Sequence, residues 1–258
     1  MPHLPSPEDA WREVLTKPQT GGEARLFQHL PSDPRCLLCQ APYGRPFGPL
    51  LKVLGYGRSE RYPQLCNPCF RHVAKNPGGA EVALTVLFTD VRGSTAIAEK
   101  RSAGDFSRLL DGFYALVTEA VRAESGIIDK FLGDGVMALF IPSFTAGQHA
   151  ARGLAAARKI VTGAQLPVGV GVNTGTAFTG LLGPTAEVAS FSAVGDAVNV
   201  AHRLGDAAAA GDLIISAQTA SEAGLDPTNG SEPWVSRNLP VKGREQPVQT
   251  WSLQIPSG

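Results

Sequence analysis

Two short apolar runs on either side of a glycine-rich turn form the clearest pattern in the chain. Residues 127–132 and 136–141 flank Gly133-Asp134-Gly135, and glycine on both sides of an aspartate is typical of a tight turn. The second run has no polar residue on either face, so we expect a strand that is buried on both sides. Lys130 and Asp134 place opposite charges near the turn, which is costly between apolar strands unless a ligand uses them.

Other apolar segments predict an alternation of strands and helices. Strands are expected at residues 83–88, 167–172, 177–182, 213–216 and 248–253. Helices are expected after Gly93, from Ser102 to about Gly126, at 146–161 and from about Ala197. We expect Ser94 or Thr95 to cap the first helix, and Gly175 to turn the chain between two strands. This alternation predicts an α+β fold, with an antiparallel or mixed sheet and helices on one face.

The composition changes near residue 78. Residues 1–78 hold 12 of the 20 prolines and all four cysteines, and Asn76-Pro77-Gly78-Gly79 marks a break in the chain. A length of 258 residues is enough for one sizeable domain with a small satellite. We therefore expect a small module at residues 1–78 and a larger domain at residues 79–258.

The four cysteines form two closely spaced pairs. Two residues separate Cys36 from Cys39 and Cys66 from Cys69, and 26 residues lie between the pairs. Two such knuckles supply four thiolates for a tetrahedral metal, so the spacing predicts a structural Zn²⁺ site in a module with little apolar core. Three alternatives remain open: a redox or iron–sulfur site, disulfides, which are less expected in a cytosolic chain, and a knuckle that needs no metal.

Charge and hydropathy narrow the possible partners. The chain has 23 basic and 23 acidic residues, whereas generic binding to nucleic acid or a membrane surface needs excess positive charge. The chain has no run of about 18 apolar residues, and residues 1–11 lack the pattern of a signal peptide. We expect a cytoplasmic protein that binds neither nucleic acid nor membranes.

Polar residues gather at the ends of the predicted strands and on one later helix. Asp90 follows the 83–88 strand and Asp134 lies at the hairpin turn, so two carboxylates could hold Mg²⁺ ions together with substrate phosphates. Asn199 and Arg203 are four residues apart and share one side of a helix, which suits a sugar and a phosphate. The non-functional alternatives are that Asp90 is only a turn residue, and that Asn199 and Arg203 only form a solvated face of the helix.

At these residues the chain resembles the class III adenylate/guanylate cyclases over about residues 82–254. The resemblance implies a ferredoxin-like α+β domain that works as a homodimer, with Asp90 and Asp134 of one chain facing the nucleotide-binding residues of the other. The matching stretches are Leu87 to Thr95, Asp129 to Asp134, Val168 to Gly175, Phe191 to Arg203, and Val241-Lys242-Gly243.

The resemblance also implies roles for single residues in the chemistry. Asp90 and Asp134, with the carbonyl of Val91, match the ligands of two Mg²⁺ or Mn²⁺ ions. Asn199 matches the residue that orients the ribose, and Arg203 matches the arginine that stabilises the transition state.

Three further residues match positions that contact the nucleotide. Lys130 matches the position that reads the purine, and lysine favours adenine because an ammonium only donates whereas adenine N1 accepts. Ser192 replaces the aspartate of many members and resembles a bacterial Ser/Thr-type subgroup. Lys242 matches the lysine that contacts the triphosphate.

The expected activity is that of an adenylate cyclase, which forms 3′,5′-cyclic AMP and pyrophosphate from ATP. One alternative is a nucleotide sensor without catalysis, which would be expected to lack a metal-binding aspartate or Arg203. The other is a nucleic-acid-binding zinc knuckle, for which the ten basic and six acidic residues of 1–78 give only a small positive excess.

Overall fold

The chain folds into two compact units, which are described separately. One comprises residues 1–82, 142–147 and 178–192, and the other residues 83–141, 148–177 and 193–258. In the part of the chain that the structure describes, no helix is both long and apolar enough to cross a bilayer. The computed structural model describes residues 6–17, 22–27, 29–30, 34–184, 188–241, 244 and 246–255.

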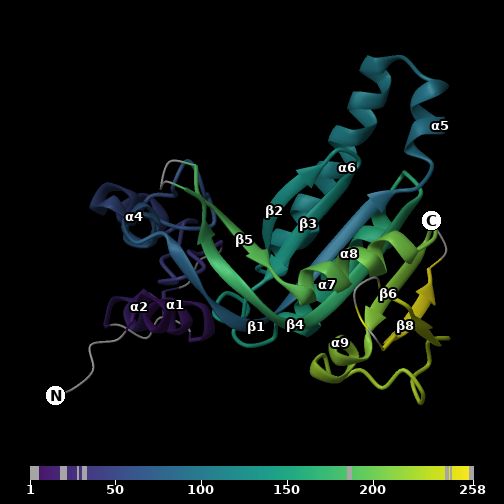
Figure 1. The fold of residues 1–258 in the computed structure, drawn as a ribbon. Coiled ribbons are helices and arrows are strands. Elements are labelled where there is room, and N and C mark those ends of the chain that lie inside the picture. The colour runs from purple at the N-terminus through teal and green to yellow at the C-terminus, as the bar shows by residue number, and fades with distance from the viewer. Residues whose placement is uncertain are drawn as a thin grey trace. The chain divides into compact units, whose positions relative to one another are not determined.

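The first half of the sheet follows a βαββαβ order, which is the ferredoxin-like pattern (Figure 1). The elements are β1 (Gly78–Val91), α5 (Ser94–Glu99), α6 (Ala103–Ala123), β2 (Ile127–Leu132), β3 (Gly135–Phe140), α7 (His149–Gly163) and β4 (Val168–Leu182). The chain continues through β5 (Ser190–Val194), α8 (Asp196–Ala207), β6 (Asp212–Ser216), α9 (Ala217–Glu222), β7 (Val235–Leu239) and β8 (Val248–Gln254).

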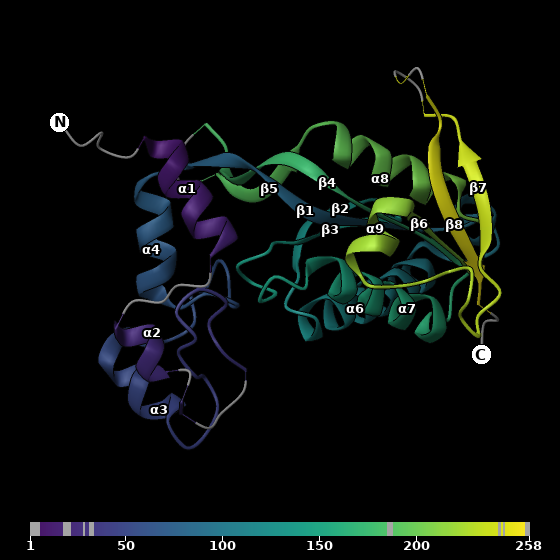
Figure 2. The ribbon, with the colours of Figure 1, turned by 90° about the horizontal axis from the view of Figure 1, so that it is seen from below.

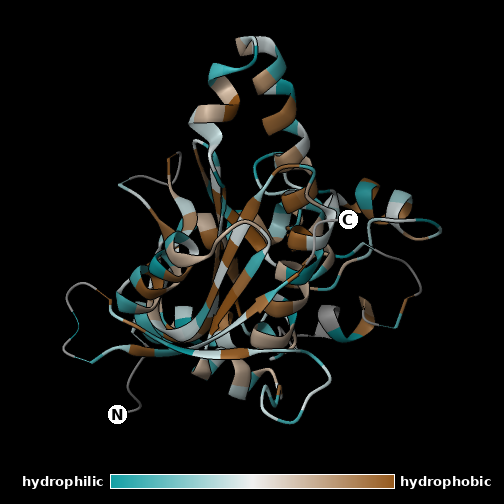
Figure 3. Cartoon of the chain, turned by 90° about the vertical axis from the view of Figure 1, so that its right-hand side faces the viewer, coloured by the Kyte–Doolittle hydropathy of each residue, from teal (hydrophilic) through white to brown (hydrophobic). Residues whose placement is uncertain are grey.

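The strands form one mixed sheet in the order β2-β3-β1-β4-β6-β8-β7, with β5 paired to β4. β1 runs antiparallel to β3, and β4 runs parallel to β6. The predicted hairpin is confirmed as β2 and β3, and every residue of β3 is buried. Figure 3 shows hydrophobic residues concentrated along the central strands, as an apolar core on both faces requires.

Helices cover both faces of this sheet, so the expectation of helices on one face was wrong. Leu213 and Ile215 of β6 pack in the core formed with α6 and α7, whereas Ile214 packs in a second core with α8. Alternate residues of a strand point to opposite faces, so the two cores lie on opposite sides. Figure 2 likewise shows α8 across the sheet from α6 and α7.

Two local expectations were wrong for steric reasons. β4 is one continuous strand, and Gly175 lies within it rather than in a turn. A Cβ at Gly175 would lie 3.1 Å from the Ala197 Cβ, so this glycine permits a close approach of α8. The N-cap of α5 is Gly93, with a left-handed φ of 68°, rather than Ser94 or Thr95.

The cysteine-containing unit is built from short helices and loops. Its buried aromatic residues meet edge to face: Phe191 contacts Trp11, Tyr62 and Phe144 at ring-centroid distances of 6.4, 5.4 and 5.9 Å. Its helices are α1 (Pro7–Thr16), α2 (Gly22–Phe27), α3 (Gly48–Leu51), a π-helical turn at Lys52–Tyr56, and α4 (Asn67–Lys75).

Candidate active site

The antiparallel register of β1 and β3 brings Asp90 beside Asp134. Asp90 lies opposite Gly135, the residue after Asp134. The Val91 amide donates a hydrogen bond to the Asp134 carbonyl at 3.1 Å, which ties the end of β1 to the turn. The structure therefore brings together the two aspartates predicted to bind metal, whereas the Val91 side chain is buried in the core.

The electrostatics of this pair fit a divalent cation. Burial raises the pKa of Asp90, and the negative charge of Asp134 raises it further. The Asp90 Oδ1 atom is buried and has no hydrogen-bond partner among the described residues. A buried carboxylate oxygen without a partner, next to a second carboxylate, is the donor set that Mg²⁺ prefers.

Arg92 is a charged residue at this site that the sequence analysis missed. Its Nη1 lies 3.5 Å from the Asp90 Oδ2, and its Nη2 donates to the carbonyl of Gly205 in α8. The Asp-x-Arg spacing at the end of a strand could have indicated it, because residues two apart in a strand share a face. Arg92 therefore links the end of β1 to the helix that carries Asn199 and Arg203.

Lys130 lies on β2 next to an irregularity in the strand pairing. The register shifts between Ile128 and Lys130, and such a bulge changes the direction of neighbouring side chains. The Asp129 side chain is fully buried, with its Oδ2 3.5 Å from the Lys130 Nζ. The Lys130 side chain is 47% exposed, so its amine remains accessible to a ligand.

The tip of the hairpin is held by α6. The Tyr114 hydroxyl donates to the Gly133 carbonyl, and its ring lies 4.8 Å from the ring of Phe131. This contact was also missed, since Tyr114 lies within the helix expected from Ser102 to about Gly126, for which we predicted no site residue. It fixes the turn that carries Asp134.

Asn199 and Arg203 are both exposed on α8, as their spacing predicted. The Arg203 Nη1 lies 3.1 Å from the Asp206 Oδ2, one turn along the same helix. Both side chains therefore face solvent within this chain.

α8 approaches the sheet closely because glycines face each other. A Cβ on Gly171 of β4 would lie 2.0 Å from the Gly205 nitrogen, and a Cβ on Gly205 would lie 3.0 Å from the Phe88 Cβ. Backbone contact at this point sets the distance of α8 from the end of β1.

The two remaining residues predicted to bind nucleotide are Ser192 and Lys242. Ser192 is on β5, in the cysteine-containing unit, where it is buried and its carbonyl accepts a hydrogen bond from the Thr179 hydroxyl at 2.8 Å. Lys242 lies outside the residues that the structure describes.

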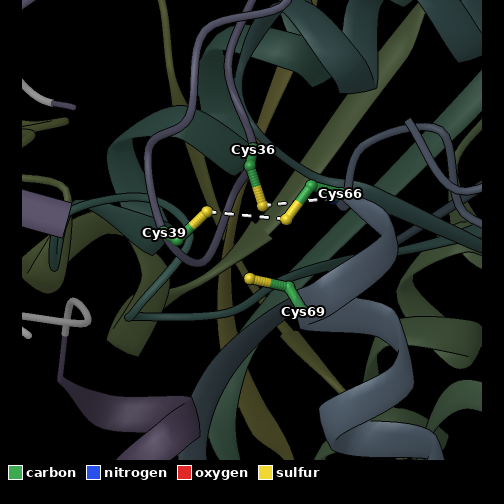
Figure 4. A group of neighbouring side chains, drawn as sticks. All are labelled: Cys36, Cys39, Cys66 and Cys69. Carbon is green, nitrogen blue, oxygen red and sulfur yellow. Dashed lines mark hydrogen bonds between the residues drawn. The ribbon is translucent and has the colours of Figure 1, made fainter. Parts of the chain in front are cut away.

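The four cysteines converge on one point (Figure 4). Their sulfur atoms all lie within 4.8 Å of one another, with 3.6 Å between those of Cys39 and Cys66. A tetrahedral zinc site with Zn–S bonds of about 2.3 Å requires sulfur–sulfur distances of about 3.8 Å. The Cys66 amide donates to the Cys36 sulfur at 3.3 Å, a contact that favours a thiolate. The four sulfur atoms are therefore close enough together to hold a zinc ion.

Comparison with known proteins adds independent findings. Residues 80–254 match the family described as the adenylate and guanylate cyclase catalytic domain. The adenylate cyclase of Anabaena cylindrica is 30% identical over 184 residues, which are 66% of this chain and 36% of that protein. The chain thus spans about a third of the length of the curated relatives it matches.

Solved cyclase structures share the fold. The adenylyl cyclase CyaB from P. aeruginosa is 27% identical with a TM-score of 0.59, over 70% of this chain and 97% of that one. The guanylyl cyclase Cya2 is 25% identical with a TM-score of 0.58, over 68% of this chain and 93% of that one.

Proposed function

Because the chain belongs to the family of adenylate and guanylate cyclase catalytic domains, we propose that it is an adenylate cyclase that forms 3′,5′-cyclic AMP and pyrophosphate from ATP. The buried Asp90 Oδ1 carries this proposal, since it lies beside a second carboxylate and has no hydrogen-bond partner among the described residues. A nucleotide sensor without catalysis would not need that pair.

The site residues divide into those that hold metal and those that hold nucleotide. Asp90, Asp134 and the Val91 carbonyl would hold two Mg²⁺ or Mn²⁺ ions. Bound there, the ions would lower the pKa of the attacking hydroxyl and neutralise charge on the departing pyrophosphate. In the proposed reaction the ribose 3′ oxygen bonds to the α-phosphorus, and the bond from that phosphorus to the bridging oxygen breaks.

The nucleotide would be bound by side chains that complement its hydrogen-bonding groups and its charge. Lys130 donates to adenine N1, and the Ser192 hydroxyl accepts from the adenine amino group. Asn199 orients the ribose, and Arg203 stabilises charge on the reacting phosphorus. Lys242 contacts the triphosphate.

We also propose that the active form is a homodimer with two equivalent sites, each using the aspartates of one chain and the nucleotide-binding residues of the other. Phe131 and Leu132, at the tip of the hairpin, are large apolar residues with exposures of 50% and 45%. A second copy would cover them. The proposal includes a zinc-binding module at residues 1–78 and a catalytic domain at residues 79–258.

Product analysis tests the proposed activity. The purified chain is incubated with Mg²⁺ or Mn²⁺ and either ATP or GTP, and the products are separated by chromatography. We expect cyclic AMP and pyrophosphate in equal amounts from ATP, with much less cyclic GMP from GTP. Cyclic GMP as the main product would assign the chain to the guanylate cyclases.

Substitution of Asp90 tests the observation on which the proposal rests. We expect Asp90→Asn to lower the rate by at least about 100-fold, because the neutral amide neither balances a cation nor replaces its ligand oxygens. Asp111→Asn, which changes an exposed aspartate of α6, serves as the matched control and should leave the rate unchanged. Equal rates for Asp90→Asn and the unaltered chain would overturn the proposal.

A further inference from the structure

The four cysteines and the strand that carries Ser192 belong to the same compact unit. Cys66 and Cys69 bracket the start of α4, and the segment of residues 57–65, here called the 57–65 loop, leads directly into Cys66. Residues 178–192, which include most of the β4–β5 connection, belong to this unit although they are more than 100 residues later in the chain. The cysteine site and Ser192 are therefore parts of one structure.

The 57–65 loop is closed by backbone contacts around Cys66. Cys66 forms an isolated bridge with Arg58, and the Asn67 amide donates to the Gly57 carbonyl at 2.8 Å. The Ser59 amide donates to the Leu65 carbonyl, also at 2.8 Å. Because both ends of the loop meet at Cys66, the position of this cysteine determines the position of the loop.

The closed loop holds β5 through two side chains. The Phe191 amide donates to the Tyr62 hydroxyl at 2.9 Å, and Arg61 donates to the Ala189 carbonyl. The Phe191 ring is buried at 1% exposure, edge to face with the Tyr62 ring. The residue directly before Ser192 is thus held by both its backbone and its side chain.

We propose that the four thiolates bind one Zn²⁺ ion, and that this ion, through Cys66 and the 57–65 loop, fixes the position of Ser192. Binding releases the protons of the thiols that were still protonated, and no electrons are transferred. The metal site acts on nucleotide affinity through Phe191, and this part of the inference rests on the proposed function. Tyr62 is a positioning residue, because it contacts the strand and not the nucleotide.

Metal content and hydrogen exchange test the site without any assay of activity. We expect one zinc per chain by elemental mass spectrometry of the full-length protein. Stripping with a chelator should speed amide exchange in peptides covering residues 188–194 by about tenfold, and Zn²⁺ alone should restore protection. Peptides from residues 135–140 should not change. No bound zinc, or equal exchange before and after stripping, would overturn the proposal.

Two variants of the 57–65 loop test the connection between this loop and β5 without changing the cysteines. Tyr62→Phe keeps the ring but removes the hydroxyl that accepts from the Phe191 amide. We expect it to retain zinc, to lose protection at residues 188–194 and to raise the KM for ATP severalfold, with kcat within about twofold. Glu60→Gln changes an exposed side chain of the same loop and should change none of these quantities. An unchanged hydrogen-exchange rate at residues 188–194 in Tyr62→Phe would disprove the proposed link between the 57–65 loop and β5.

The two proposals fail in different ways. If the chain forms no cyclic nucleotide but binds zinc and shows the expected hydrogen exchange, the proposed link between the zinc site and Ser192 is supported and the proposed activity is refuted. If the chain is active, yet Tyr62→Phe has the same hydrogen-exchange rates and the same KM as the unaltered chain, the proposed link is refuted and the proposed activity is supported.

Discussion

The residues at the site differ in how much of their position and contacts could be predicted from the sequence. The position of Asp134 at a hairpin turn could be predicted, because it lies between two glycines that separate two apolar runs. The spacing of Asp90 and Arg92 could have indicated that Arg92 lies near the site, but its contact with the Gly205 carbonyl could not be predicted, since that contact depends on a helix more than 100 residues later. Ser192 was predicted only as a residue of the nucleotide site, and the contacts of the preceding residue, Phe191, with Tyr62 and Trp11 could not be predicted without the fold.

Lys130 carries the expected preference for adenine. We expect Lys130→Glu to raise the KM for ATP by about 10- to 100-fold, because a hydrogen bond from a charged group contributes about 1.5–3 kcal/mol and a carboxylate cannot donate to adenine N1. Steady-state kinetics with ATP and GTP measure the change. Lys100→Glu, at the exposed end of α5, is the control. An unchanged KM in Lys130→Glu would show that another group reads the base.

His149 gives the fold a pH dependence. The residue begins α7 and is buried, with its Nδ1 3.0 Å from the Thr85 hydroxyl and its Nε2 3.4 Å from Glu222. Burial lowers the pKa of His149, and Glu222 opposes this only in part. The unfolded chain therefore takes up the proton at a higher pH than the folded chain does.

The stability that neutral His149 contributes is full above the unfolded pKa of about 6.5, and it is lost as the pH falls through the lower folded pKa. We expect the free energy of unfolding in urea to fall more between pH 7.5 and pH 5 in the unaltered chain than in His149→Asn. A variant with the same pH dependence as the unaltered chain would contradict this assignment.

At the scale of elements, apolar runs identified the buried strands and missed the exposed ones. β3 is buried throughout and was predicted, whereas β7 is exposed at nearly every residue and carries no apolar signal. β5 was missed because its Phe191-Ser192-Ala193 sequence is too short to separate from the helix that follows. Gly175 resembled a turn because a sequence cannot distinguish glycine needed for a turn from glycine needed for close packing.

The close contact of α8 with β4 can be tested with paired glycine substitutions. We expect Gly171→Ala to lower the free energy of unfolding by about 1–3 kcal/mol or more, since its Cβ has no space against Gly205, and to lower activity by displacing Asn199 and Arg203. Gly112→Ala in α6 meets nothing within 4 Å and should stabilise the chain by about 0.5–1 kcal/mol. Urea unfolding and cyclase assays distinguish the two variants. Equal changes in the free energy of unfolding for Gly171→Ala and Gly112→Ala would refute the close packing of α8 on β4.

At the scale of the whole molecule, the proposed dimer predicts recovery of activity on mixing. Asp134→Ala and Arg203→Ala should each be inactive alone. When the two variants are mixed and exchange subunits, half of the dimers carry one intact site of two, so we expect about a quarter of the normal rate.

The control mixture combines Asp134→Ala with Asp90→Ala. Both changes fall in the same half of each proposed site, so no dimer has an intact site and no activity should return. Recovery in the control mixture as well, or in neither mixture, would rule out sites shared between chains.

The path of the chain limits how residues 1–78 can be removed or replaced by another domain. The backbone passes between the two compact units five times, at residues 82–83, 141–142, 147–148, 177–178 and 192–193. Deleting residues 1–78 would leave Phe191 without the rings of Trp11 and Tyr62, so we expect such a truncation to aggregate. A fusion protein in which another domain replaces residues 1–78 would leave Phe191 exposed in the same way.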